Sequence, residues 1–155
     1  MNQIIFSSWG GEVVDNREKD IQSFSPVSII ELPENFKQDT KIKALIGWYG
    51  IVIRSEGVDI LDLCRAYMAA VHKHSCGRCI PCPTGTGIMV DMLEKLCRGQ
   101  GSPEDIDTLK GLAEMVSSTS KCSIGQSGPL PILDALKYFP DRFDSAVSNQ
   151  DTCQP

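Results

Sequence analysis

The sequence has no long apolar run. Its longest, residues 42–53, is interrupted by Lys43, whereas a helix that crosses a membrane needs about 18–20 apolar residues. The N-terminus also lacks the basic segment and apolar core that a secretory signal requires. We therefore expect no membrane span, no secretory signal and a reducing, cytoplasmic location.

Positive charge is also scarce, with 15 Lys and Arg against 20 Asp and Glu and a formal net charge of −5. A protein that binds nucleic acid needs a basic face that replaces the counterions around phosphates. The charge balance therefore argues against nucleic acid as a partner. The remaining composition, 41% hydrophobic and 23% charged, predicts a globular chain of about one domain.

The first third of the chain is predicted to be β-rich. Residues 27–32 and 44–53 favour strands, and Gly47 and Gly50 indicate a bulge or turn within the second. A segment of about 55 residues makes a poor independent domain. We therefore expect residues 1–56 to pack on the rest of the chain or on another subunit.

From residue 57 onward, apolar residues recur every three or four positions, which predicts helices. Asp59 and Ser102 are suitable N-caps, and Pro140 should end the last helix. The four expected helices cover about 59–74, 85–97, 102–116 and 129–139. The predicted fold class is α+β, a small β-rich N-terminal segment followed by a four-helix bundle over 57–147, with a flexible tail at 148–155.

Seven cysteines are many for 155 residues, and in the cytoplasm they indicate metal binding before disulfides. Cys76, Cys79 and Cys82 have C-x2-C-x2-C spacing, and Cys122 follows after 39 intervening residues. This three-plus-one division is typical of the ligands of one [4Fe–4S] cluster. The alternative is zinc held by the same cysteines, although zinc sites usually pair two two-ligand knuckles.

The other reactive side chains receive simpler interpretations. Cys64 and Cys97 lie on or beside apolar helix faces, where cysteine behaves as a small hydrophobe, and Cys153 is expected to be an exposed thiol. His72 and His74 precede the motif and are expected to form hydrogen bonds or lie on the surface. We find no paired acid and base and no activated nucleophile, so no catalytic residue is predicted.

A glycine-rich turn, residues 84–87, follows the third cysteine of the motif. Such a turn at a helix N-terminus can hold a phosphate. Close approach of the backbone to the cluster is the simpler explanation, because glycine has no side chain in the way.

At this point the sequence shows a resemblance. Residues from about 50 to 143 resemble the C-terminal cluster-binding region of the NADH-oxidising flavoprotein subunit of respiratory complex I, which also occurs in soluble hydrogenases and formate dehydrogenases. The matching segments are 72–82 (HKHSCGRCIPC), 85–87 (GTG), 102–107 (SPEDID), 122–125 (CSIG) and 132–143. The resemblance implies that Cys76, Cys79, Cys82 and Cys122 hold one [4Fe–4S] cluster.

The chain also departs from that family. Cysteine-arginine-glutamate-glycine commonly stands where this chain has CPTG at 82–85. The family's large domain for NADH and FMN has no counterpart in residues 1–56, which at most resemble a shortened remnant of its small β-grasp-like domain. The resemblance therefore implies no FMN and no NAD on this chain, and no oxidation of NADH by it alone.

Two functions follow as hypotheses. In the first, the chain is a non-catalytic electron-transfer subunit that relays single electrons within a multisubunit oxidoreductase. Its partners would be a flavin-bearing or ferredoxin-like subunit and a catalytic subunit, such as a hydrogenase or a formate or aldehyde oxidoreductase. In the second, the chain is a structural or assembly module in which a cluster or zinc only stabilises the fold.

Overall fold

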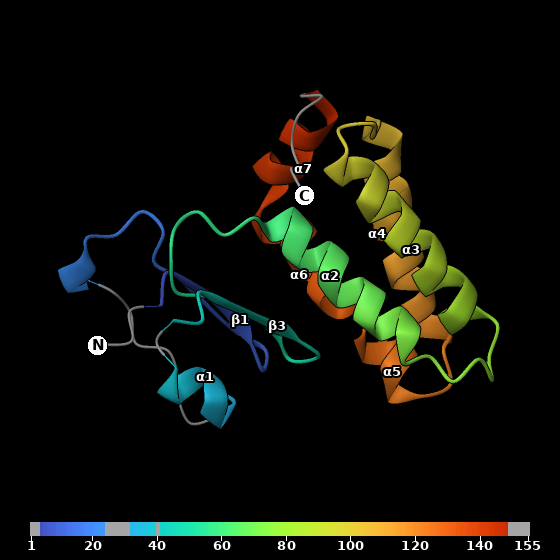
Figure 1. Cartoon of the computed structure of the whole chain (residues 1–155), viewed down its shortest axis with the longest axis horizontal. Coiled ribbons are helices and arrows are strands. Elements are labelled where there is room, and N and C mark those ends of the chain that lie inside the picture. The colour runs from blue at the N-terminus through green and yellow to red at the C-terminus, as the bar shows by residue number, and fades with distance from the viewer. Residues whose placement is uncertain (1–3, 24–31, 40, 149–155) are drawn as a thin grey trace. The chain divides into compact units, whose positions relative to one another are not determined.

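The computed structural model describes residues 4–23, 32–39 and 41–148 (Figure 1). The chain divides into two compact units, Met1–Val58 and Asp59–Pro155. The first unit contains a small antiparallel sheet and the second contains the long helices. The predicted α+β class, with a β-rich segment before a helical bundle, is confirmed.

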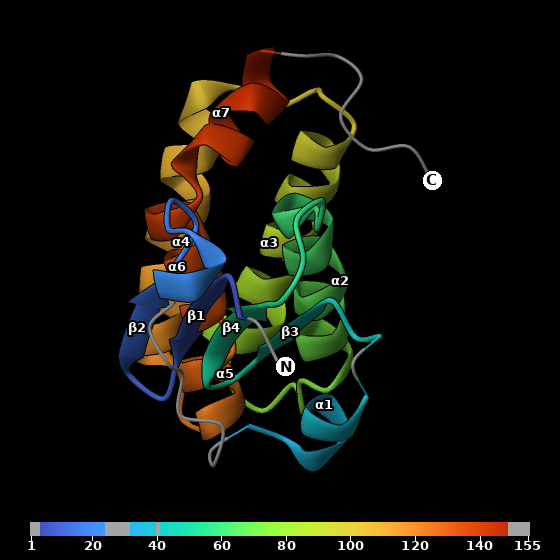
Figure 2. The same cartoon turned by 90° about the vertical axis from the view of Figure 1, so that its left-hand side faces the viewer.

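The sheet of the first unit has four strands in the order β2-β1-β4-β3, which can be followed across Figure 2. The strands are β1 (Phe6–Trp9), β2 (Glu12–Asp15), β3 (Ala44–Gly47) and β4 (Gly50–Ile53). All neighbouring strands are antiparallel. The sequence did not reveal β1 and β2, because β1 buries Ser7 and Ser8 beside its apolar residues and so shows no alternation of polar and apolar residues.

The turn expected at Gly47 and Gly50 is confirmed, since β3 and β4 form a hairpin there. Gly50 has a φ of 140°, and a Cβ at this position would lie 1.5 Å from the carbonyl oxygen of Ser8. Only glycine fits so close to the neighbouring strand. The strand predicted at 27–32 falls almost entirely on 24–31, which lie outside the described residues.

The core of the first unit lies between the sheet and the segments that connect its strands. Two short helices occur in these segments, η1 (Ile21–Ser23) and α1 (Glu34–Gln38). Phe36 of α1 is fully buried, and the guanidinium of Arg54 lies 3.6 Å from the centre of its ring. The buried apolar cluster comprises Ile4, Trp9, Leu32, Phe36 and Val52.

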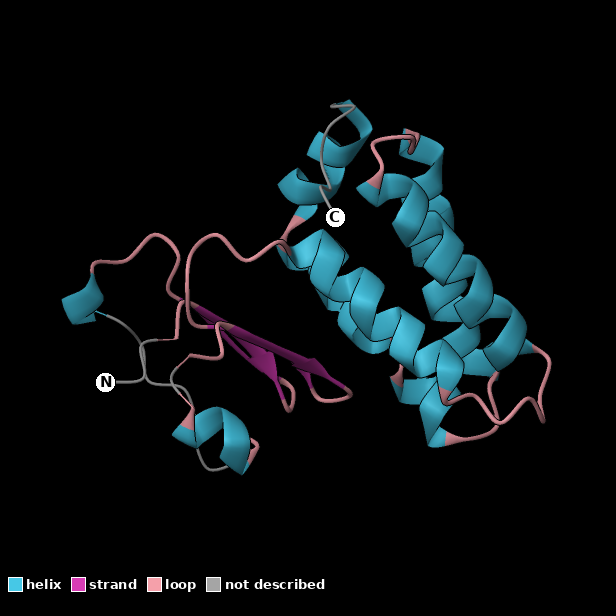
Figure 3. Ribbon diagram, viewed as in Figure 1, coloured by secondary structure: helices cyan, strands magenta, loops and turns pink. Residues whose placement is uncertain are grey.

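The second unit is a helical bundle (Figure 3). Its helices are α2 (Ile60–Lys73), α3 (Pro81–Cys97), α4 (Pro103–Thr119), α5 (Ser123–Ser127), α6 (Leu130–Tyr138) and α7 (Pro140–Ser148). Helix α2 packs on α3, α3 packs on α4, and α4 packs on α5 and α6. Within the described ranges, no helix is both long and apolar enough to cross a membrane.

The four expected helices are present, with three differences. Helix α3 begins at Pro81 and not near Gly85, because proline suits the first position of a helix. The segment 117–128, which separates the third and fourth expected helices, contains α5, and a further helix, α7, starts at Pro140. Proline ended α6 as expected, yet its fixed φ also starts the next helix.

The expected N-caps are confirmed. The Asp59 carboxylate accepts hydrogen bonds from the backbone N–H groups of Leu61 and Asp62, and it also pairs with Arg142 of α7 at 2.7 Å. Ser102 and Asp105 form a reciprocal capping box at the start of α4. The starts of α2 and α4 therefore follow from local chemistry.

Gly85 sets how closely α3 and α4 pack. A Cβ at this position would lie 2.2 Å from Cγ2 of Val116, which is fully buried and β-branched. We expect Gly85→Ala to lower the free energy of unfolding by about 1–3 kcal/mol, because Val116 has few alternative rotamers on a helix.

The matched control is Gly111→Ala on α4, where a Cβ would meet nothing within 4 Å. Alanine there should raise the free energy of unfolding by up to about 1 kcal/mol, since it favours helix more than glycine does. Urea denaturation of both variants measures the difference. Equal stability of the two would contradict this account of Gly85.

Candidate iron–sulfur site

The four cysteines of the motif lie on two connections of the bundle. Cys76 and Cys79 lie between α2 and α3, and Cys82 lies in the first turn of α3. Cys122 is the N-cap of α5. Figure 3 shows both connections at the same end of the bundle. The fold therefore brings segments that are 39 residues apart in the sequence to one place.

The motif begins with a tight turn and ends in a helix. Gly77 has a φ of 71°, which glycine adopts without strain. Pro81 occupies the first turn of α3 and fixes the backbone just before Cys82. Exposure falls along the motif, since Cys76 is exposed, Cys79 is intermediate and Cys82 is buried, with 3% of its surface accessible.

Cys79 connects the two segments. Hydrogen bonds from the backbone N–H groups of Lys121 and Cys82 lower the pKa of its thiol, and the positive charge of Lys121 acts in the same direction. Donors of this kind stabilise sulfur in its negatively charged form. The residue before Cys122 therefore contributes directly to the environment of Cys79.

Cys82 is held on both sides. Its sulfur lies 3.3 Å from the hydroxyl of Ser75. A Cβ at Gly125 of α5 would lie 3.2 Å from the Cβ of Cys82, and 2.3 Å from the hydroxyl oxygen of Ser120. Glycine is therefore required for α5 to lie this close to the start of α3.

A short chain of hydrogen bonds fixes the backbone at Cys82. The hydroxyl of Thr86 donates to the carbonyl oxygen of Cys82 at 2.5 Å, and it lies 2.9 Å from Nδ1 of His72. A hydroxyl has one proton, so His72 must donate through Nδ1. His72 thus forms a hydrogen bond, as expected, and connects α2 to the first turns of α3.

The glycines after Cys82 lie close to neighbouring helices. Gly85 approaches Val116 of α4, and a Cβ at Gly87 would lie 3.2 Å from the ring of His72. Both glycines therefore permit close packing of helix on helix. Their expected approach to the cluster stays a prediction, and Gly125, which sequence reasoning did not single out, approaches Cys82.

The donor set offered by the two connections consists of thiols. Among the residues that the structure describes, no three His, Cys, Asp or Glu side chains form a group that could hold one ion. Zinc at about 2.3 Å from each sulfur would bring its ligands within about 4 Å of one another. A cubane cluster takes one thiolate per iron, which spaces the ligands more widely. Four thiols, with backbone N–H groups directed at Cys79, are a donor set that fits such a cluster.

The remaining described cysteines lie in the core of the bundle. Cys64 is fully buried and Cys97 is 3% exposed, and burial raises the pKa of the Cys64 thiol. Both are therefore the small hydrophobes that the sequence predicted. Cys153 lies outside the described residues.

Comparison with known proteins places this arrangement in a family. Residues 62–146 match the model of the NADH-ubiquinone oxidoreductase-F iron-sulfur binding region. The chain belongs to this family. The match covers more than half of the 155 residues and includes all four cysteines of the motif, so the resemblance inferred from the sequence is confirmed.

Two curated relatives extend the similarity of this iron–sulfur binding region to nearly the whole chain. The beta subunit of the NADP(+)-dependent formate dehydrogenase of Moorella thermoacetica is 38% identical over 139 residues, which cover 90% of this chain and 19% of that protein. The beta subunit of the NADPH-Fe(3+) oxidoreductase of Geobacter sulfurreducens is 35% identical over 145 residues, which cover 92% and 21%. The chain thus spans about a fifth of the length of these relatives.

A solved structure has a similar fold. The NAD+-reducing [NiFe]-hydrogenase matches with a TM-score of 0.55 and 24% identity, over 63% of this chain and 16% of that one. At this identity the match supports the fold of the matched part of the chain and nothing more specific.

Proposed function

We propose that Cys76, Cys79, Cys82 and Cys122 bind one [4Fe–4S] cluster. The observation that supports this most directly is the packing of Cys79 and Cys82 against the segment that contains Cys122. This packing supports a site shared by the fourth cysteine and the other three, as the three-plus-one spacing predicts. The proposed domain boundaries, 1–56, 57–147 and 148–155, assign the whole ligand set to the helical part.

When bound, the cluster supplies exchange of a single electron. The chain's own residues prepare the site for it. The N–H groups of Lys121 and Cys82 stabilise the thiolate of Cys79, and burial of Cys82 in the first turn of α3 keeps water from its side chain. The hydrogen bonds of Thr86 and Ser75 hold that turn and its sulfur in position.

We further propose that the protein is a non-catalytic electron-transfer subunit of a multisubunit oxidoreductase. The relatives are named as subunits of a formate dehydrogenase and of an NADPH-Fe(3+) oxidoreductase, which supports a redox complex as the setting. The partners would be a flavin-bearing or ferredoxin-like subunit and a catalytic subunit, such as a hydrogenase or a formate or aldehyde oxidoreductase. In this proposal the 155 residues bind neither FMN nor NAD.

The second candidate is a structural module in which a cluster or zinc only stabilises the bundle. The packing of Gly125 against Cys82 and Ser120 favours some role in stability, since a metal centre would fasten α5 to α3. The two candidates differ in whether the centre changes oxidation state.

Analysis of anaerobically prepared protein tests the proposal. We expect about four iron and four sulfide per chain, and an electron paramagnetic resonance signal that appears on reduction and disappears on reoxidation. Flavin fluorescence should be absent after denaturation. Zinc in place of iron, or iron without a reversible signal, would instead support the structural module.

A further inference from the structure

Ser120 is a buried polar residue at the end of α4. It is the C-cap of that helix, and only 6% of its surface is accessible. Both of its backbone groups are bonded, since its N–H donates to the carbonyl oxygen of Val116 and its carbonyl oxygen accepts from Nε2 of Gln126. Its hydroxyl has no hydrogen-bond partner among the residues that the structure describes. A buried hydroxyl without a partner destabilises a fold, so its presence calls for an explanation.

The three hydroxyls that precede Ser120 on α4 are each bonded to a backbone carbonyl. Ser117 donates to a carbonyl oxygen of α5 at 2.6 Å. Ser118 and Thr119 both donate to the carbonyl oxygen of Met115, at 3.1 and 2.6 Å. Carbonyl oxygens are thus the usual partners of hydroxyls at this end of α4, and Ser120 is the exception.

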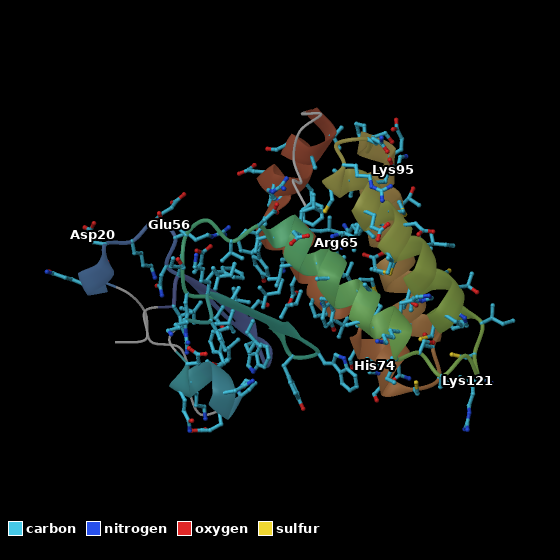
Figure 4. All side chains as sticks on the ribbon, viewed as in Figure 1. Asp20, Glu56, Arg65, His74, Lys95 and Lys121 are labelled. Carbon is cyan, nitrogen blue, oxygen red and sulfur yellow. The ribbon has the colours of Figure 1, made fainter. Side chains whose placement is uncertain are left out.

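The hydroxyl of Ser120 lies close to the start of α3, which carries one of the proposed ligands. A Cβ at Gly125 would lie 2.3 Å from Oγ of Ser120 and 3.2 Å from the Cβ of Cys82. Figure 4 shows Lys121, the residue after Ser120, at the same end of the bundle as His74. The hydroxyl therefore lies beside the cysteines and away from the far end of the bundle.

Cys79 is the ligand on which the hydroxyl acts. The pKa of the Cys79 thiol is lowered first by the backbone N–H groups of Lys121 and Cys82, and to a smaller extent by the hydroxyl of Ser120. The hydroxyl is thus near this sulfur, although it does not complete a hydrogen bond to it. A thiolate bound to iron is a stronger acceptor than a thiol, because hydrogen bonds to charged groups are shorter and about twice as strong as neutral ones.

Ser75 supplies the same chemistry to a second proposed ligand. Its hydroxyl lies 3.3 Å from the sulfur of Cys82. As a cluster ligand Cys82 is a thiolate and has no proton to give, so the hydroxyl of Ser75 is then the donor. Ser75 directly precedes Cys76, and Ser120 lies two residues before Cys122. Each of the two segments that carry cysteines therefore also carries a serine hydroxyl beside a ligand.

We propose that Ser120 donates a hydrogen bond to the thiolate of Cys79 when the cluster is bound, and that this bond raises the reduction potential of the cluster. Reduction adds one electron, and the sulfur ligands carry part of the added negative charge. A donor to such a sulfur stabilises the reduced state more than the oxidised state, which raises the potential. The inference rests on the proposed function, which assigns Cys79 to the cluster.

The test compares reduction potentials of the full, cluster-loaded chain and three variants, measured by titration with dithionite and electron paramagnetic resonance. Ser120→Ala removes only a hydroxyl, and Ser75→Ala removes the hydroxyl beside Cys82. Ser118→Ala is the matched control, because Ser118 is exposed and its hydroxyl bonds to a backbone carbonyl of the same helix. The potential is read from the cluster-loaded fraction, so a partial loss of iron does not obscure it.

At a fixed applied potential, Ser120→Ala is expected to lower the ratio of reduced to oxidised cluster about three- to tenfold. For a one-electron centre a tenfold change in this ratio corresponds to about 59 mV. Ser75→Ala should change the ratio in the same direction, because it also removes a donor to a thiolate. Ser118→Ala should leave the ratio unchanged.

A second measurement detects the proton of the hydrogen bond. Electron–nuclear double resonance of the reduced cluster, in H2O and in D2O, reports the exchangeable protons close to its sulfurs. These include the backbone protons of Lys121 and Cys82 as well as the hydroxyl proton of Ser120. Ser120→Ala should remove one exchangeable coupling and keep the backbone couplings, whereas a variant that only disturbs the packing would alter all of them.

The outcomes separate this inference from the proposed function. An unchanged or higher potential in Ser120→Ala, an equal change in Ser118→Ala, or the persistence of every exchangeable coupling would overturn the role of Ser120. The electron-transfer function would then stand, because the unmodified chain still holds a reversible cluster. If the unmodified chain holds no reversible cluster, the proposed function fails, and the inference that rests on it fails as well.

Discussion

Replacing Cys82 by serine is expected to reduce the iron content from about four per chain to below one. A serine hydroxyl binds iron less strongly than a thiolate does. Because Cys82 is the most buried of the four cysteines of the motif, water cannot enter to take its place as a ligand. Cys76→Ser, Cys79→Ser and Cys122→Ser should have the same direction of effect. Iron and sulfide analysis and the visible absorption of the cluster measure the loss.

Two cysteines outside the motif provide the controls. Cys97→Ala removes a buried thiol from the far end of α3, about 22 Å along the helix from Cys82. It should lower stability by about 1 kcal/mol and leave the iron content unchanged. Cys153→Ser should also leave it unchanged. A serine variant at Cys122 that retains a full, redox-active cluster would disprove the proposed ligand set.

Replacing Gly125 by alanine is expected to disrupt the site without changing a ligand. The new Cβ would lie 2.4 Å from the Cβ of Ser120 and 3.2 Å from that of Cys82. A Cβ cannot rotate away, so α5 must move from the start of α3. We expect a loss of stability of about 2 kcal/mol or more and faster loss of the cluster in air, measured by denaturation and by the decay of its absorption.

A second substitution tests the cause. Ser120→Gly removes both atoms of Ser120 that the new Cβ would meet most closely. The double variant Gly125→Ala/Ser120→Gly should therefore recover part of the stability lost in Gly125→Ala, although Ser120→Gly alone should be mildly destabilising. If the two effects simply add, the steric explanation is wrong, because clashing neighbours should show a favourable coupling.

Features that depend on local chemistry could be predicted from the sequence. Asp59 and Ser102 begin α2 and α4 because their side chains bond to backbone N–H groups within three residues. The three-to-four-residue spacing of apolar residues predicted the apolar faces of four helices. Gly47 and Gly50 predicted the turn between β3 and β4. The spacing of Cys76, Cys79 and Cys82 indicated an iron–sulfur cluster, because these three proposed ligands are close together in the sequence.

Predictions from the sequence failed where contacts between distant segments determine whether a strand or helix forms. Strand β1 exists because its backbone pairs with both β2 and β4, although Ser7 and Ser8 give it no alternating pattern. Helix α5 has only five residues, SIGQS over 123–127, which are too few to show a helical period, so the sequence predicted no helix there. It packs on α3 and α4. These elements depend on partners that a local window does not contain.

The sequence by itself determined the α+β class, the starts of α2 and α4, and the cysteine motif with its family, because each rests on residues close in the chain or on a specific spacing. Only the tertiary structure decided that Gly85 approaches Val116, that Gly125 approaches Cys82, and that Lys121 acts on Cys79. These relations join residues many positions apart, so they are fixed by how the helices pack and not by any local propensity.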